Sequence, residues 1–212
     1  MARSLSRRQL QVWVVAFIFV GFLIIDQAVK IWVKTHMYVH ESIHITDWFY
    51  ITFIENNGMA FGMELFNKLF LTTFRLLATT AVAVYIAKLI RKGVSWGYLI
   101  CLAFIMTGAA GNIIDCVFYG LIFNDAQWPD VAHFVPFGEG YSTWFRGRVV
   151  DMFYFPIAEW TWPTWMPIIG GDHCQFFSYI FNVADACISV AVVALLLFCR
   201  QTLAQEFSNE ES

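Results

Sequence analysis

Four aspartates lie in parts of the sequence that are otherwise apolar. Asp26, Asp115 and Asp185 each occur in a long apolar run, and Asp151 lies in the strand-like stretch 149–153. An ionised side chain at the middle of a bilayer costs at least about 2.5–3.5 kcal/mol on insertion scales. Each intramembrane carboxylate therefore needs a partner or a function.

Two neighbouring carboxyl groups would suit peptide hydrolysis. Because they cannot both ionise easily, they share a proton. One can then act as a base toward water while the other acts as an acid toward the carbonyl. A pair formed by Asp151 and Asp185 could perform this aspartic-protease chemistry without a metal or a cofactor, although spacing alone does not pair them.

Polar residues accompany these carboxylates at helical spacing. Lys30 follows Asp26 by four residues, acid before base, which favours an ion pair on a helix. A three-residue spacing recurs in two pairs: Asn112 with Asp115, and Asn182 with Asp185. These groups could hold a reactive carboxylate, but a structural ion pair and interhelical hydrogen bonds explain the same spacing.

Other chemistries find little support. The sequence has no glycine-rich phosphate loop. His36, His40 and His44 are four residues apart but straddle the end of a helix, so we expect no metal site there. The five cysteines have no metal-site spacing and are interpreted as small buried hydrophobic residues.

The composition indicates a membrane protein. Of the 212 residues, 14% are charged and 59% apolar, whereas a soluble domain has about 25% charged residues. The net charge of −3 and the lack of a basic block exclude a nucleic-acid partner. We expect one integral membrane domain over residues 1–212, with membrane lipids as neighbours and a monomeric state.

Four segments are long and apolar enough to span a bilayer. They are about 12–33, 69–90, 96–119 and 176–198. Seven of the thirteen lysines and arginines flank these segments on one side: Arg3, Arg7, Arg8, Lys88, Arg91, Lys92 and Arg200. By the positive-inside rule that side is cytoplasmic. Both termini are then inside, and all four aspartates fall toward the outer leaflet.

Two outer segments connect the spans. The first, about 35–67, contains a β-like stretch from 43 to 54 that is rich in β-branched and aromatic residues. The second, about 120–175, is long for a loop and carries five tryptophans. Because tryptophan prefers the headgroup level, we expect this segment to lie on the outer membrane surface.

Five short boxes, in order, resemble the lipoprotein signal peptidase (signal peptidase II) family. They are Asp26-Gln27-x-x-Lys30, Asn56-x-Gly58-x-Ala60-Phe61, Gly108-Ala109-x-Gly111-Asn112-x-x-Asp115, Val149-Val150-Asp151-Met152-Phe153 and Phe181-Asn182-x-Ala184-Asp185. Each box alone is weak, but five in order within a four-span topology are specific.

The resemblance implies an aspartic endopeptidase of the bacterial inner membrane, whose active site faces the periplasm. Such an enzyme removes the signal peptide of a prolipoprotein just before a cysteine that carries diacylglycerol. The catalytic pair would be Asp151 and Asp185. Asn56, Gly58 and Phe61 would lie on an extracytoplasmic β-platform. The remaining implied site residues hold the site together or touch substrate: Asp26, Lys30, Gly108, Asn112, Asp115, Asn182 and Ala184. The family's mobile flap could correspond to the β-like stretch or to the Trp-rich segment.

The chain also departs from the family pattern. The third box usually ends in Asp-Arg, but here Cys116 follows Asp115. We hypothesise that Arg148, three residues before Asp151, supplies the missing guanidinium. The segment between Cys116 and Arg148 is longer than the resemblance to the family leads us to expect.

An alternative function is a proton- or ion-coupled transporter, because intramembrane carboxylates mark ion pathways. The small number of spans and the lack of a visible inverted repeat argue against it.

Overall fold

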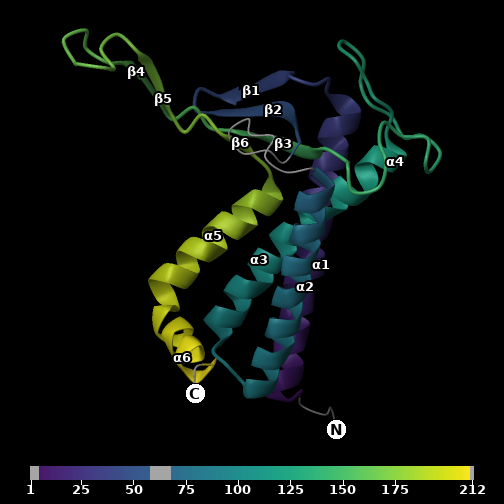
Figure 1. Ribbon diagram of the computed structural model, residues 1–212, viewed down its shortest axis with the longest axis vertical. Helices are drawn as coiled ribbons and strands as arrows, with labels where there is room; N and C mark the ends of the chain where they lie inside the picture. The colour runs from purple at the N-terminus through teal and green to yellow at the C-terminus, as the bar shows by residue number, and fades with distance from the viewer. Residues whose placement is uncertain (1–4, 58–67, 211–212) are drawn as a thin grey trace.

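The computed structural model describes residues 5–57 and 68–210, and it consists of a helical bundle with a small β-sheet across one end (Figure 1). The helical elements are α1 (Arg7–His36), α2 (Lys68–Lys92), α3 (Trp96–Ile114), the π-helical turn η2 (Asp115–Tyr119), α4 (Gly120–Ile122), α5 (Val183–Phe198) and α6 (Arg200–Glu210). The strands are β1 (Ser42–Thr46), β2 (Phe49–Asn56), β3 (Val149–Tyr154), β4 (Ala158–Thr161), β5 (His173–Phe176) and β6 (Ile180–Phe181).

Three helical segments in the described ranges are long and apolar enough to cross a membrane: α1, α2 and the continuous segment Trp96–Ile122. A fourth span results if α5 and α6, which meet at a bend of 85°, count as one. The chain is thus a helical membrane protein with three to four candidate spans. The first three predicted spans coincide with these helices within a few residues.

The predicted start of the fourth span at residue 176 is wrong. Residues 173–176 and 180–181 are strands, Phe177 has a positive φ of 64°, and the helix begins only at Val183. The intervening run is apolar and aromatic, a pattern that suits a short buried strand as well as a helix. Asn182 caps the helix, since its side chain accepts a hydrogen bond from the backbone N–H of Asp185.

The main sheet has the order β1-β2-β3-β6 and is antiparallel throughout. The β-like stretch predicted at 43–54 is a hairpin of β1 and β2 rather than one strand. In the register of β2 with β3, Asp151 lies opposite Ile54. Phe153 lies opposite Phe181, so β6 brings the start of α5 beside the strand that carries Asp151. The sheet therefore joins two segments that are thirty residues apart.

Strands β4 and β5 form a separate hairpin that projects from the sheet, away from the helices (Figure 1). At the opposite end of the bundle, Arg7 and Gln11 of α1 donate hydrogen bonds to the carbonyl of Val94, at 3.3 and 3.0 Å. Lys92 pairs there with Glu206 of α6 at 2.7 Å. The start of α1, the α2–α3 turn and α6 thus meet at the end farthest from the sheet.

Helices α3 and α5 pack closely because Gly108 has no side chain. A Cβ at this position would overlap the carbonyl oxygen of Ala184 and approach Cγ1 of Ile188 to 2.7 Å. Small residues commonly permit such close approach between membrane helices. The position of α5 against the bundle therefore depends on this glycine.

We expect Gly108→Ala to lower the apparent midpoint of thermal unfolding in detergent, because overpacking costs about 1–3 kcal/mol. The matched control is Gly21→Ala in α1, where an added Cβ meets nothing within 4 Å. The control should leave the midpoint unchanged or raise it slightly. Equal behaviour of the two variants would contradict the packing argument.

Candidate active site

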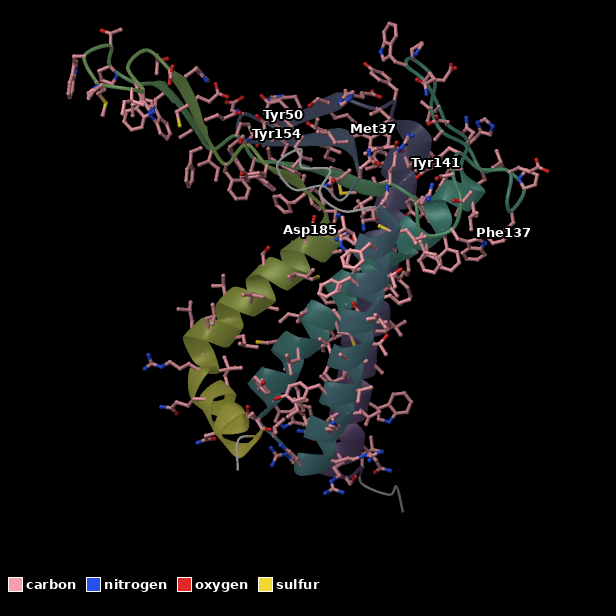
Figure 2. The ribbon with its side chains drawn as sticks, in the orientation of Figure 1. Met37, Tyr50, Phe137, Tyr141, Tyr154 and Asp185 are labelled. Carbon is pink, nitrogen blue, oxygen red and sulfur yellow. The ribbon has the colours of Figure 1, made fainter. Side chains whose placement is uncertain are left out.

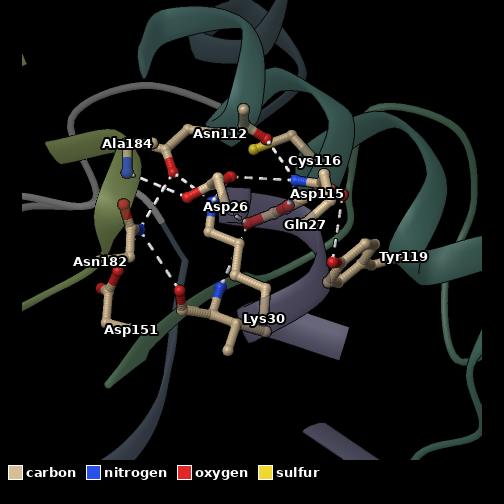
Figure 3. Close-up of polar contacts among 12 residues, drawn as sticks. Asp26, Gln27, Lys30, Asn112, Asp115, Cys116, Tyr119, Asp151, Asn182 and Ala184 are labelled. Atoms are coloured by element: carbon tan, nitrogen blue, oxygen red, sulfur yellow. Dashed lines mark hydrogen bonds and ion pairs between the residues drawn. The ribbon is translucent and has the colours of Figure 1, made fainter. Parts of the chain in front are cut away.

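A buried lysine lies at the centre of the polar cluster (Figure 3). The side chain of Lys30 is 0% exposed, and its Nζ lies 3.0 Å from Oδ2 of Asp26 and 2.7 Å from Oδ2 of Asp115. It also donates to Oδ1 of Asn112 at 2.8 Å. One ammonium group therefore links α1 to the last turn of α3 and to η2.

Gln27 completes this inner part of the cluster. Its Nε2 contacts Oδ1 of Asp115 at 2.9 Å and Oδ2 of Asp26 at 3.1 Å, and its Oε1 accepts a hydrogen bond from the hydroxyl of Tyr119 at 3.2 Å. Neither Gln27 nor Tyr119 was among the predicted site residues. The position of Gln27 directly after Asp26 was the available signal.

Asn112 connects the buried charges to Asp185. Its Oδ1 accepts from Lys30 and, at 3.0 Å, from Nδ2 of Asn182, while its own Nδ2 donates to Oδ1 of Asp185 at 2.8 Å. The Asn-x-x-Asp spacing predicted that these groups share a helix face. The structure shows in addition that Asn112 bonds across to α5.

Asn182 contacts both members of the predicted catalytic pair. Its Nδ2 donates to Oδ1 of Asp151 at 2.6 Å, and its Oδ1 accepts from the backbone N–H of Asp185 at 2.9 Å. The backbone N–H of Asn182 in turn reaches Oδ2 of Asp185 at 3.4 Å, which completes a capping box. Asn182 therefore contacts both carboxyl groups, that of Asp151 through its side-chain amide and that of Asp185 through its backbone N–H. Figure 2 places Asp185 at the end of α5 that faces the sheet.

Asp151 is only 3% exposed on β3. Its Oδ2 accepts a hydrogen bond from Nδ2 of Asn56, on β2, at 3.1 Å. Burial, and after it the nearby carboxylate of Asp185, raise the pKa of Asp151 to about 7. The carboxyl group can consequently hold a proton near neutral pH.

Asp26 also accepts a hydrogen bond at the start of α5. Its Oδ1 accepts from the backbone N–H of Ala184 at 2.9 Å, which satisfies a free donor in the first turn of the helix. A Cβ on Gly111 would lie 2.5 Å from Oδ2 of Asp26 and 3.2 Å from the Cβ of Ala184. Gly111 and Ala184 are therefore small because three helices meet here.

Arg148 lies in a second charged group next to this site. Its Nη1 pairs with Oε2 of Glu55 at 2.7 Å and with Oδ1 of Asp125 at 3.0 Å, and the guanidinium lies over the ring of Tyr141. Lys34 of α1 pairs with the other oxygen of Glu55. Burial would raise the pKa of Glu55, but Lys34 and Arg148 outweigh it and hold that pKa below its ordinary value.

A different arginine, Arg75 of α2, approaches Cys116, the residue after Asp115. Its Nη1 lies 4.0 Å from the thiol sulfur. Sequence reasoning did not single out Arg75, although an arginine within a predicted span is the same kind of signal as an intramembrane aspartate. Two other predicted residues, Gly58 and Phe61, lie outside the described residues.

An apolar groove of about 410 Å³ begins beside the cluster. It runs between α1, α3 and α5, and its walls include Phe22, Phe104, Val183, Ala186, Cys187 and Val190. Val183 and Ala186 lie in the first turn of α5, so the groove reaches the end of the helix at which Asp185 lies. Within residues 5–57 and 68–210, no three His, Cys, Asp or Glu side chains are grouped as a metal site.

Comparison with known proteins identifies relatives of this chain. Residues 18–200 match the family described as Signal peptidase (SPase) II. A lipoprotein signal peptidase of Porphyromonas gingivalis is 48% identical over 204 residues, which cover 96% of this chain and 89% of that protein. A lipoprotein signal peptidase of Amoebophilus asiaticus is 32% identical over 201 residues, which cover 90% of this chain and 79% of that protein.

The fold has a counterpart among solved structures. A bacterial membrane enzyme determined by the in meso method aligns with a TM-score of 0.56 at 23% identity, covering 87% of this chain and 90% of that one. At this identity the likeness concerns the fold alone. The sequence matches, together with the cluster of buried aspartates, lead to one conclusion: the chain belongs to the signal peptidase II family of lipoprotein signal peptidases.

Proposed function

We propose that Asp151 and Asp185 are the catalytic pair of this lipoprotein signal peptidase. The family is one of aspartic peptidases, and the chain has its activity. The observation that carries the proposal is that Asn182 donates hydrogen bonds to both carboxyl groups, from its side chain to Asp151 and from its backbone to Asp185, which spacing alone could not pair. The surrounding amides restrict both side chains without adding charge.

The proposed reaction is attack of water on the scissile carbonyl. Asp185 lies in the first turn of α5, where the helix dipole favours negative charge, and it removes a proton from the water. Asp151, protonated near neutral pH, donates its proton to the carbonyl oxygen as the new C–O bond forms. When the C–N bond breaks, Asp185 returns the proton to the departing nitrogen, and the tetrahedral intermediate gives its hydroxyl proton back to Asp151.

The proposed substrate is a prolipoprotein that already carries diacylglycerol on the cysteine after the scissile bond. The site lies between the helical bundle and the sheet, which suits a bond near the membrane surface. With the basic ends of α1 and α2 on the cytoplasmic side, the sheet and the carboxylates would face the periplasm. The apolar groove between α1, α3 and α5, which reaches the first turn of α5, supports this assignment, because a signal peptide's apolar segment or an acyl chain fits such a surface.

We expect Asp151→Asn and Asp185→Asn each to abolish cleavage, because either change removes an acid or a base from the reaction. Purified protein should be assayed with a diacylglyceryl-modified precursor. Asp172→Asn, at an exposed carboxylate in the β4–β5 hairpin region, is the matched control and should remain active. Full activity in either site variant would refute the pair.

The rate should also depend on pH in a definite direction. Because the pKa of Asp151 is about 7, the shared proton is lost as pH rises above neutrality, and kcat/KM should fall there. The hydrogen bond from Asn56 favours the ionised form and lowers that pKa. Asn56→Ala should therefore move the alkaline limb of the pH–rate profile to higher pH. A shift to lower pH would show that another group controls the limb.

We further propose that Arg148 supports the site through Glu55, whose neighbour Asn56 contacts Asp151. Arg148→Ala should reduce cleavage several-fold and lower the stability of the protein. The variant removes one of the cations that pair with the Glu55 carboxylate, whose side chain is only 9% exposed. Arg146→Ala, two residues away and exposed, is the control and should leave cleavage unchanged. If the two variants cleave equally well, Arg148 has no part in the site.

A further inference from the structure

Arg75 is a charged residue inside a membrane helix. It is the eighth residue of α2, whose 25 residues form a candidate span. A guanidinium at such a depth is costly unless it is compensated or reaches a polar surface. The contacts of Arg75 therefore show how its charge is accommodated.

The described contacts compensate the guanidinium poorly. Arg75 is half-buried, and Nη1 lies 4.0 Å from the sulfur of Cys116. A thiol is a weak acceptor, whereas guanidinium has five N–H donors. Among residues 5–57 and 68–210, no carboxylate lies within ion-pair distance of Arg75, in contrast to Lys30, Lys34 and Arg148.

The orientation of α2 is fixed on this side. Thr72, one turn before Arg75, is 1% exposed, and its hydroxyl donates to the carbonyl oxygen of Phe145 at 3.0 Å. Residues three apart share a helix face, so Arg75 points to the same side of α2 as this contact. Its contact with Cys116 places it one residue from Asp115, which binds Lys30.

Arg75 and Lys68 are the two cations that α2 places in this region. The hydrogen bonds of the aspartate cluster come from α1, α3, η2, β2, β3 and α5. A guanidinium whose described contacts use few of its donors, next to a thiol near this cluster, suits an oxygen acceptor that arrives with the substrate. Oxygen acceptors are available in the carbonyl groups of the peptide and in the esters of its diacylglyceryl group.

We propose that Arg75 is a substrate-binding residue whose guanidinium donates hydrogen bonds to carbonyl oxygens around the lipid-modified cysteine. This role rests on the peptidase function proposed above. Arg75 neither transfers a proton nor attacks the peptide bond, so its removal weakens binding and leaves the chemical step largely intact. A phosphate group of a neighbouring phospholipid offers the same acceptor chemistry and must be distinguished by experiment.

The test is steady-state cleavage of a diacylglyceryl-modified precursor by the purified full chain in nonionic detergent without added phospholipid. Arg75→Ala should raise KM about tenfold or more, as expected for lost hydrogen bonds to a charged group, with little change in kcat. Arg91→Ala, an exposed arginine at the other end of α2, is the control and should keep the wild-type KM. Arg75→Lys should give an intermediate KM, because it keeps the charge but not the planar fork.

A double variant makes the test more specific. With Arg75→Ala in place, Cys116→Arg returns a guanidinium from the adjacent position and should lower KM toward the wild-type value. If Arg75→Ala does not fold, Arg75→Lys together with Arg75→Gln supplies the same comparison. An unchanged KM in the folded variants would overturn the proposal.

Two further results would also overturn it. A shift in the pH–rate profile without a change in KM would mean that Arg75 acts only as a distant counter-charge to the carboxylates. A KM effect that requires added phospholipid would assign the guanidinium to a lipid phosphate. Failure of the wild type to cleave the precursor would instead refute the proposed substrate, so the two failures are distinguishable.

Discussion

The arrangement of the site depends on the burial of the Lys30 ammonium group. Removing such a charge from water costs several kcal/mol, and it is tolerated only when opposite charges and hydrogen bonds surround it. Here Asp26, Asp115 and Asn112 supply them from α1, η2 and α3. Loss of one partner from a buried pair typically costs about 3–5 kcal/mol, so these segments are held in one relative position.

The same ion cluster determines where the proposed catalytic groups lie. Asp26 also accepts a hydrogen bond from the first turn of α5, so the helix that carries Asp185 is attached to the lysine through one carboxylate. Asn112 and Asn182 then extend the network as neutral amides. Because neutral groups separate Lys30 from Asp151, the cation lowers the pKa of Asp151 less than burial and Asp185 raise it. A direct ion pair would instead favour the ionised form and remove the acid.

Local spacing predicted the parts of the site that lie on one helix. Asp26 with Lys30, and Asn112 with Asp115, follow helical periods that are visible in the sequence, whereas the same spacing in Asn182 and Asp185 is that of a helix cap. The apolar runs predicted three helices closely. The fourth was misplaced at its start because an aromatic run does not distinguish a strand from a helix, and the cap at Asn182 decides the boundary.

Contacts between distant segments could not be read in this way. The approach of Asp151 to Asp185 needs the pairing of β3 with β6, and the ion pair of Arg148 with Glu55 joins residues 93 positions apart. Periodicity carries no information about such pairs. The family resemblance predicted that Asp151 and Asp185 form a pair, because the boxes retain their order. It could not predict which cation replaces the arginine that the family usually has at the position of Cys116.

The charges at the end of the bundle nearest the sheet differ in how completely the protein compensates them. Lys30, Lys34 and Arg148 each have carboxylate partners, and Glu55 has two cations. In the described part of the chain, the carboxyl pair of Asp151 and Asp185 accepts hydrogen bonds only from amide groups, Arg75 approaches a thiol, and Lys68 donates to the side-chain oxygen of Asn57. A protein that buries so few charges keeps an incompletely compensated one only where another molecule completes its surroundings. By this reasoning, we expect the reacting bond to lie beside the carboxyl pair and oxygen acceptors of the substrate to lie beside Arg75.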